Sequence, residues 1–95
     1  MNLDKEISRG IQAERILNDP IYVEAMDKVR NGILNAIVDA PIRDREGVHE
    51  LKLMLKLLKD VDMNIREVVQ TGKMALIQSE QDRKIARLKG LKVYG

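Results

Sequence analysis

Apolar side chains recur along this chain at the three- and four-residue spacing of amphipathic helices. Residues 3–18 form the first such segment, which is short and is weakened by Gly10 in its interior. Residues 20–39 form the second, and Asp19 followed by Pro20 is a typical helix start. The apolar seam of the second segment consists of Tyr22, Met26, Val29, Ile33, Ala36 and Ala40. The pattern predicts two consecutive helices.

The third segment begins near Asp44 and runs to Thr71, where Gly72 predicts a helix end. Its seam again has spacings of three and four, at Leu51, Met54, Leu58, Val61, Ile65 and Val68. At about 1.5 Å per residue, such a helix would be about 40 Å long. Residues 73–90 are helical by propensity but thinly apolar, so they either continue the third helix or dock loosely. We therefore predict an all-α fold, a long antiparallel hairpin with weaker terminal helices.

The stretch LKLMLKLLK at residues 51–59 carries more apolar surface than one neighbouring helix can cover. At about 100° per residue, its apolar side chains sweep an arc of about 200°, and three lysines fill the rest. A chain of 95 residues also buries only a small core, and this one has no cysteine for a disulfide. Both observations predict a helical-bundle homo-oligomer. The residues expected at its interface are Leu51, Leu53, Met54, Leu57, Leu58, Val61 and Ile65.

Charge is unevenly distributed along the chain. Residues 1–79 carry 12 Lys/Arg and 13 Asp/Glu, whereas residues 80–95 carry five basic and two acidic residues. We therefore divide the chain into a helical hairpin core domain, 1–79, and a basic C-terminal tail, 80–95. Because the tail lacks stacking aromatic side chains, any contact with nucleic acid would be weak and independent of sequence. The alternative is a tail that is solvated or pairs with acids of a neighbouring chain.

Little in the sequence points to catalysis or to a metal. His49 is the single histidine, and with Glu46 it forms an E-x-x-H pair, which is half of the sequence signature of a di-iron site. The simpler interpretation is an exposed histidine in the first turn of a helix. No serine or threonine has the partners of a catalytic triad, and no glycine-rich phosphate loop occurs. We expect no enzymatic activity, no metal and no cofactor.

The sequence also bears on where the protein acts. No apolar run approaches the roughly 20 residues of a membrane helix. The N-terminal stretch MNLDKEISRG lacks the apolar core of a signal peptide, and the absence of cysteine fits a reducing compartment. We expect a cytoplasmic protein without membrane contact.

The stretch PIRDREG at residues 41–47 is the best candidate for a ligand site. Arg43 and Arg45 flank the expected start of the third helix, where unpaired N–H groups and the helix dipole favour an anion. The planar fork of an arginine side chain suits phosphate. Asp44 and Glu46 can instead neutralise both arginines, which would leave an ordinary solvated turn.

The tripeptide TGK at residues 71–73 can likewise be interpreted in two ways. A glycine helix stop followed by lysine is an ordinary helix end, and the alternative is that Lys73 reaches an anion. Arg43, Arg45 and Lys73 are accordingly the candidate ligand-binding residues.

The order and spacing of several motifs resemble a family of short, largely uncharacterised all-helical proteins of tailed bacteriophages. The matching patterns are RG..A..IL..P at residues 9–20, RD.EG...L.LMLK.L at 43–58 and V..TGK.A at 68–75. The resemblance implies a phage protein that acts in the cytoplasm of the bacterial host. Because the match includes polar loop residues, it also adds weight to Arg43 and Lys73 as site residues.

Two classes of function are compatible with these features. The first is a non-enzymatic oligomer that captures a small phosphate-bearing ligand, for which a nucleotide signal of bacterial immunity is the natural candidate in a phage. The second is a structural or DNA-packaging accessory that acts through the basic tail. A related alternative is an inhibitor that lays the flank at Leu53 and Leu57 into a groove of a host protein. The nearly neutral body and the scarcity of aromatic residues favour the first class.

Overall fold

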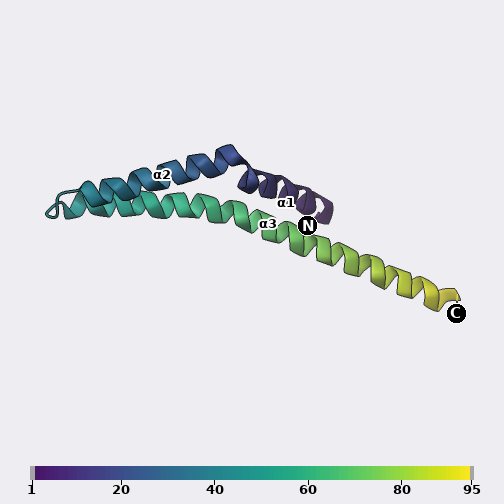
Figure 1. The fold of residues 1–95 in the computed structure, drawn as a ribbon. Coiled ribbons are helices and arrows are strands. Elements are labelled where there is room, and N and C mark those ends of the chain that lie inside the picture. The colour runs from purple at the N-terminus through teal and green to yellow at the C-terminus, as the bar shows by residue number, and fades with distance from the viewer. Residues whose placement is uncertain (1, 95) are drawn as a thin grey trace.

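Three helices joined by short connections make up residues 2–94 (Figure 1). The computed structural model describes residues 2–94, with side chains up to residue 90. Helix α1 spans Leu3–Asn18, α2 spans Pro20–Asp39 and α3 spans Arg45–Tyr94, with 50 residues in α3 alone. No strand occurs in residues 2–94. The predicted all-α class and the predicted bounds of the first two helices are therefore confirmed.

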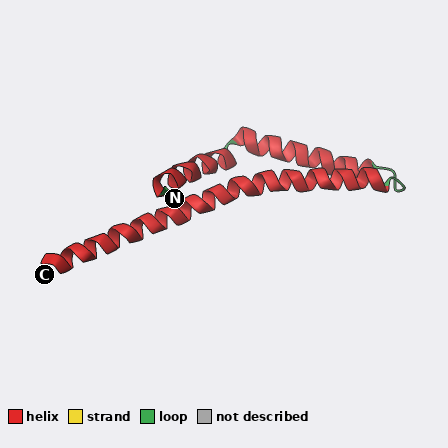
Figure 2. Ribbon diagram, turned by 180° about the vertical axis from the view of Figure 1, so that it is seen from behind, coloured by secondary structure: helices red, strands yellow, loops and turns green. Residues whose placement is uncertain are grey.

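Helix α3 is the spine of the molecule, and α1 and α2 lie one after the other along it (Figure 1). The chain reverses direction at residues 40–44, so that α2 lies beside the N-terminal part of α3 and α1 lies beside its middle (Figure 2). The C-terminal part of α3 extends beyond both helices. The radius of gyration is 21.8 Å, and the molecule measures 78 × 25 × 16 Å. A compact domain of this length would have a radius of gyration of about 12 Å, so the chain is a rod.

Short polar side chains set the helix starts. Asn2, Asp19 and Asp44 each precede a helix, and each accepts a hydrogen bond from a backbone N–H of its first turn. The donors are the amides of Lys5 (3.2 Å), Ile21 (2.8 Å) and Gly47 (2.9 Å). These caps satisfy N–H groups that have no partner inside the helix, which is why the helices begin where they do.

The predicted helix end at Gly72 is wrong. Helix α3 passes through Gly72 and reaches Tyr94, so that residues 73–90 continue it, which is one of the two alternatives considered for them. The helix also crosses the proposed domain boundary between residues 79 and 80 without a break. A glycine ends a helix by adopting a positive φ, and none of the described glycines has one. Gly72 has a different role.

Gly10 of α1 and Gly72 of α3 meet backbone to backbone. A Cβ atom on Gly72 would lie 2.7 Å from the Cα of Gly10, and a Cβ atom on Gly10 would lie 2.8 Å from the Cα of Gly72. Ala13 and Ala75, one turn further along each helix, are also buried. Gly10 is therefore the point at which α1 approaches α3 closely, and this packing compensates its poor helix propensity.

The core is a narrow line of residues, and part of each predicted seam lies outside it. Partly or fully buried positions of α3 that step by four and three include Leu51, Leu55, Leu58, Asp62, Ile65, Val69 and Gly72. Met54 and Val61, which the predicted seam included, are exposed, and so are Val29 and Ala36 of α2. The apolar arc of α3 is so wide that either of its two edges could pack against α2. The pattern of apolar residues alone therefore did not predict which edge does so.

None of the helices within residues 2–94 is long and apolar enough to span a lipid bilayer.

Gly72→Ala and Gly10→Ala should each destabilise the protein, because the new methyl group has to push two backbones apart. We expect a loss of about 1–3 kcal/mol in the free energy of unfolding, the usual range for overpacking. Gly32→Ala is the matched control, since a Cβ on Gly32 meets nothing within 4 Å. It should stabilise α2 by about 0.5–1 kcal/mol through helix propensity. Urea unfolding followed by circular dichroism measures all three, and an equal loss for Gly32→Ala and Gly72→Ala would contradict the close crossing.

Candidate ligand-binding groove

A groove of about 400 Å³ runs between α2 and α3. Leu34 and Leu55 supply its apolar lining. The charged residues that line it are Arg30, Lys52, Lys56, Lys59 and Asp62. The volume falls within the roughly 300–1,000 Å³ that is typical of small-molecule sites. Four cations around two leucines make this groove suitable for an anion that also has an apolar part.

The three lysines of the groove share one face of α3 because of their spacing. Lys52, Lys56 and Lys59 are four and three residues apart, so their side chains follow one another along the helix. All three are exposed, and the ion pairs found among the described residues do not involve them. Like charges at this spacing repel one another. An anion bound between the lysines would offset that repulsion. A stripe of lysines surrounded only by water has no such compensating charge.

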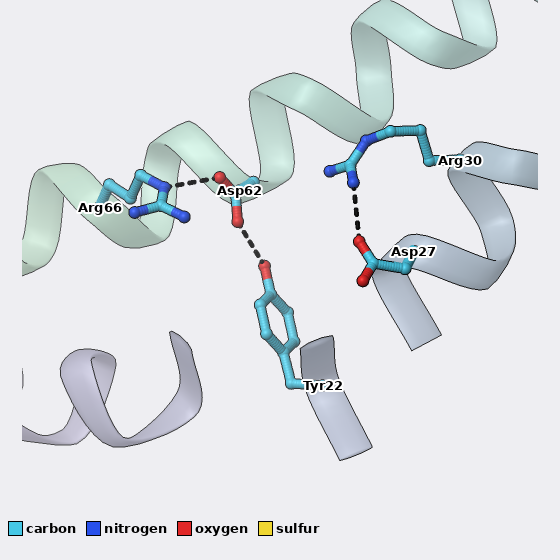
Figure 3. Close-up of polar contacts among 5 residues, drawn as sticks. All are labelled: Tyr22, Asp27, Arg30, Asp62 and Arg66. Atoms are coloured by element: carbon cyan, nitrogen blue, oxygen red, sulfur yellow. Dashed lines mark hydrogen bonds and ion pairs between the residues drawn. The ribbon is translucent and has the colours of Figure 1, made fainter. Parts of the chain in front are cut away.

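Arg30 and Asp62 line the groove from α2 and α3, and each has polar partners within the chain (Figure 3). Arg30 donates a hydrogen bond to the carboxylate of Asp27 at 2.9 Å. Asp62 accepts one hydrogen bond from the hydroxyl of Tyr22 at 3.1 Å and another from Nε of Arg66 at 2.7 Å. Because both oxygens of Asp62 are engaged, its charge is largely balanced before a ligand arrives.

The pKa values of Asp62 and of both its hydrogen-bond partners, Tyr22 and Arg66, are shifted. The hydrogen bond from Arg66 lowers the pKa of Asp62, although partial burial opposes it. Burial, and then the hydrogen bond to Asp62, raises the pKa of Tyr22. The side chain of Arg66 is 63% exposed whereas that of Asp62 is 21% exposed. Solvent therefore screens the ion pair within α3, whereas the Tyr22–Asp62 bond joins α2 to α3.

The two arginines predicted as site residues lie at the turn between α2 and α3. Arg43 and Arg45 are both exposed. The carboxylate of Asp44 already accepts the amide hydrogen of Gly47, which is among the donors that an anion at this helix start would use. The turn at residues 40–44 is thus capped by the chain itself. Anion binding there stays a prediction that depends on the two arginine side chains.

Lys73 lies far from those arginines. It follows Arg45 by 28 positions on one continuous helix, which corresponds to about 42 Å. Lys73 lines a different hollow, of about 250 Å³, together with residues of α1 and α3 that include Glu14 and Arg66. Within a single chain, Lys73 therefore lies too far from Arg43 and Arg45 to share a ligand with them. A shared ligand would require Lys73 of one subunit and the arginines of another.

The residues predicted for an oligomer interface divide into two groups. Leu51, Leu58 and Ile65 are partly buried within the chain. The other four are exposed, namely Leu53, Met54, Leu57 and Val61. Each side chain of this second group leaves about half or more of its surface open to another chain.

The sequence reasoning missed the groove. It placed Lys52, Lys56 and Lys59 on the part of the helix surface that the apolar arc leaves free, and it did not consider Arg30. The available signal was the helical spacing of the lysines, but recognising a site also required knowing which edge of α3 faces α2. Among the residues that the structure describes, no cluster of three or more metal-binding side chains occurs.

Asp62→Asn should lower stability at neutral pH by about 1–2 kcal/mol, because Tyr22 and Arg66 lose a charged acceptor. The lowered pKa of Asp62 means that its contribution is present above the unfolded value near 3.8 and is lost as the pH falls through the folded value. The variant should therefore lose less stability than the wild type on acidification. Thermal unfolding between pH 2 and pH 8 measures this.

The control for this experiment is Asp27→Asn, which breaks an exposed pair and should cost less than about 0.5 kcal/mol. Equal losses in the two variants would show that Asp62 has no special role in joining α2 to α3.

No family model matches this chain, and no curated protein or solved structure matches it either, so the function of the groove has to be inferred from its own residues.

Proposed function

We propose that this chain is a non-enzymatic binding protein that captures a small phosphate-bearing ligand in the groove between α2 and α3. The observation that carries the proposal is the set of four cations around Leu34 and Leu55. Phosphate groups would lie among the lysine ammonium groups, and an apolar part of the ligand would cover the two leucines. Capture of this kind requires no catalytic residue.

A nucleotide combines both properties that the groove favours. Its phosphates carry the negative charge, and the faces of its base are apolar enough to lie on leucine side chains. Inorganic phosphate would use the lysines alone and leave the leucines uncovered. The resemblance of the sequence to proteins of tailed phages supports a nucleotide signal of bacterial immunity as the ligand, captured in the host cytoplasm.

The proposal includes an oligomer of antiparallel helical hairpins, because the chain leaves a broad apolar surface uncovered. In such an assembly, Arg43 and Arg45 of one subunit could act with Lys73 of another at a second phosphate site. Within one subunit the length of α3 keeps them apart.

A structural or DNA-packaging role is the second candidate, and one observation favours it. Residues 80–90 continue α3 as an exposed helix beyond α1 and α2. Its described basic side chains are Arg83, Lys84, Arg87 and Lys89; the side chain of Lys92 lies outside the described residues. DNA contact through this segment would weaken steeply as salt concentration rises.

Lys52→Ala/Lys59→Ala should weaken nucleotide binding by about 10- to 100-fold, because two charge-assisted contacts are lost. Isothermal titration calorimetry with AMP, linear and cyclic dinucleotides, and inorganic phosphate measures the change. The matched control is Lys5→Ala/Lys28→Ala, which removes the same charge from exposed positions outside the groove. It should bind within about twofold of the wild type.

Other outcomes separate the alternatives. Equal weakening of nucleotide binding in both lysine variants would show that binding depends on overall positive charge and not on the groove, which would contradict the proposal. Loss of binding in Arg43→Ala/Arg45→Ala alone would move the site to the turn. Absence of nucleotide binding, with salt-sensitive DNA binding that disappears on deletion of residues 80–95, would favour the packaging role.

A further inference from the structure

The chain exposes more surface than a compact protein of its size. Its accessible surface is 8116 Å². A compact monomer of 10.9 kDa would expose about 5,600 Å². The excess of about 2,500 Å² is comparable to the roughly 1,000–2,500 Å² that each subunit of an obligate homodimer buries.

Part of this excess is an apolar stripe on α3, which we define as Leu53, Met54, Leu57 and Val61. Met54 is 51% exposed, Leu57 64% and Val61 53%, and the spacing of three and four residues aligns them along the helix. Around the helix axis, the stripe lies roughly 150° from Leu55 and Lys59, which line the groove. The stripe and most of the groove therefore face different directions, and Lys56, which lines the groove, lies at the border between them.

We infer that this apolar stripe packs against the same stripe of a second copy of the chain, with the two α3 helices antiparallel. A two-fold axis near residues 57 and 58 places Met54 opposite the partner's Val61 and brings the two Leu57 side chains together at the centre. The surface is then self-complementary, as the interface of a symmetric dimer requires.

Charges beside the stripe favour the antiparallel orientation. Lys56 and Asp60 are four residues apart, so they lie on the same edge of the stripe. When two such helices pack antiparallel, equal edges meet, and each Lys56 comes beside the partner's Asp60. Parallel packing brings opposite edges together and separates these two charges. The antiparallel pair therefore gains two opposite-charge contacts at its rim.

This inference gives the geometry of the oligomer that the proposed function includes, and in that respect it rests on the proposed function. Its test measures assembly in the absence of ligand. Failure to assemble can thus be distinguished from failure to bind nucleotides.

Sedimentation velocity of the full chain and of charge-reversed variants tests the pairing. The wild type should sediment as a dimer or a multiple of one. Lys56→Glu and Asp60→Lys should each weaken association by at least about tenfold, because like charges then meet across the interface. The double variant Lys56→Glu/Asp60→Lys restores opposite charges and should associate as the wild type does. Asp82→Lys makes the same charge change at an exposed position far from the stripe and should have no effect.

Cysteine cross-linking tests the orientation, because the chain has no cysteine of its own. Under mild oxidation, Met54→Cys/Val61→Cys should form a covalent dimer through positions 54 and 61, whereas Met54→Cys alone should not. Circular dichroism establishes that each variant keeps its helices. A monomeric wild type, a double charge variant that fails to recover association, or equal cross-linking by Met54→Cys alone would overturn the inference.

Discussion

The backbone contact between Gly10 and Gly72 holds α1 against the middle of α3, and the position of α2 depends on it. Only Asp19 separates α1 from α2, so fixing α1 also fixes where α2 begins. That places Tyr22 beside Asp62, and the hydrogen bond between them joins the start of α2 to α3. The groove between α2 and α3 is therefore shaped by a contact that lies outside it.

Helix α3 presents different chemistry on its different sides. One side carries the buried line that packs against α1 and α2, a second carries the lysines of the groove, and a third carries the apolar stripe. A 50-residue helix is long enough to hold all three, although α1 and α2 cover only part of it. In our proposal, ligand capture uses the second side and self-association uses the third, and Lys56, at the border between the two sides, takes part in both.

The sequence predicted the helices well because their starts depend on local chemistry. Asp19 before Pro20, and Asp44 before the third helix, act on amides two or three residues away. The role of Gly72 was predicted wrongly because it depends on Gly10, which lies 62 positions earlier in the chain. The groove was missed for a similar reason. Its lysines become a site only when Arg30 and Leu34 of α2 lie opposite, and the wide apolar arc of α3 allowed more than one register.

Amide chemical-shift mapping of the isotopically labelled protein, titrated with a dinucleotide, tests ligand capture most directly. The account predicts saturable shifts centred on the groove, at Arg30, Leu34, Lys52, Leu55 and Lys59. The helix at residues 80–90 should be unaffected and serves as an internal reference. Shifts confined to that exposed segment, or no shifts at millimolar nucleotide, would contradict the claim that the groove captures a phosphate-bearing ligand.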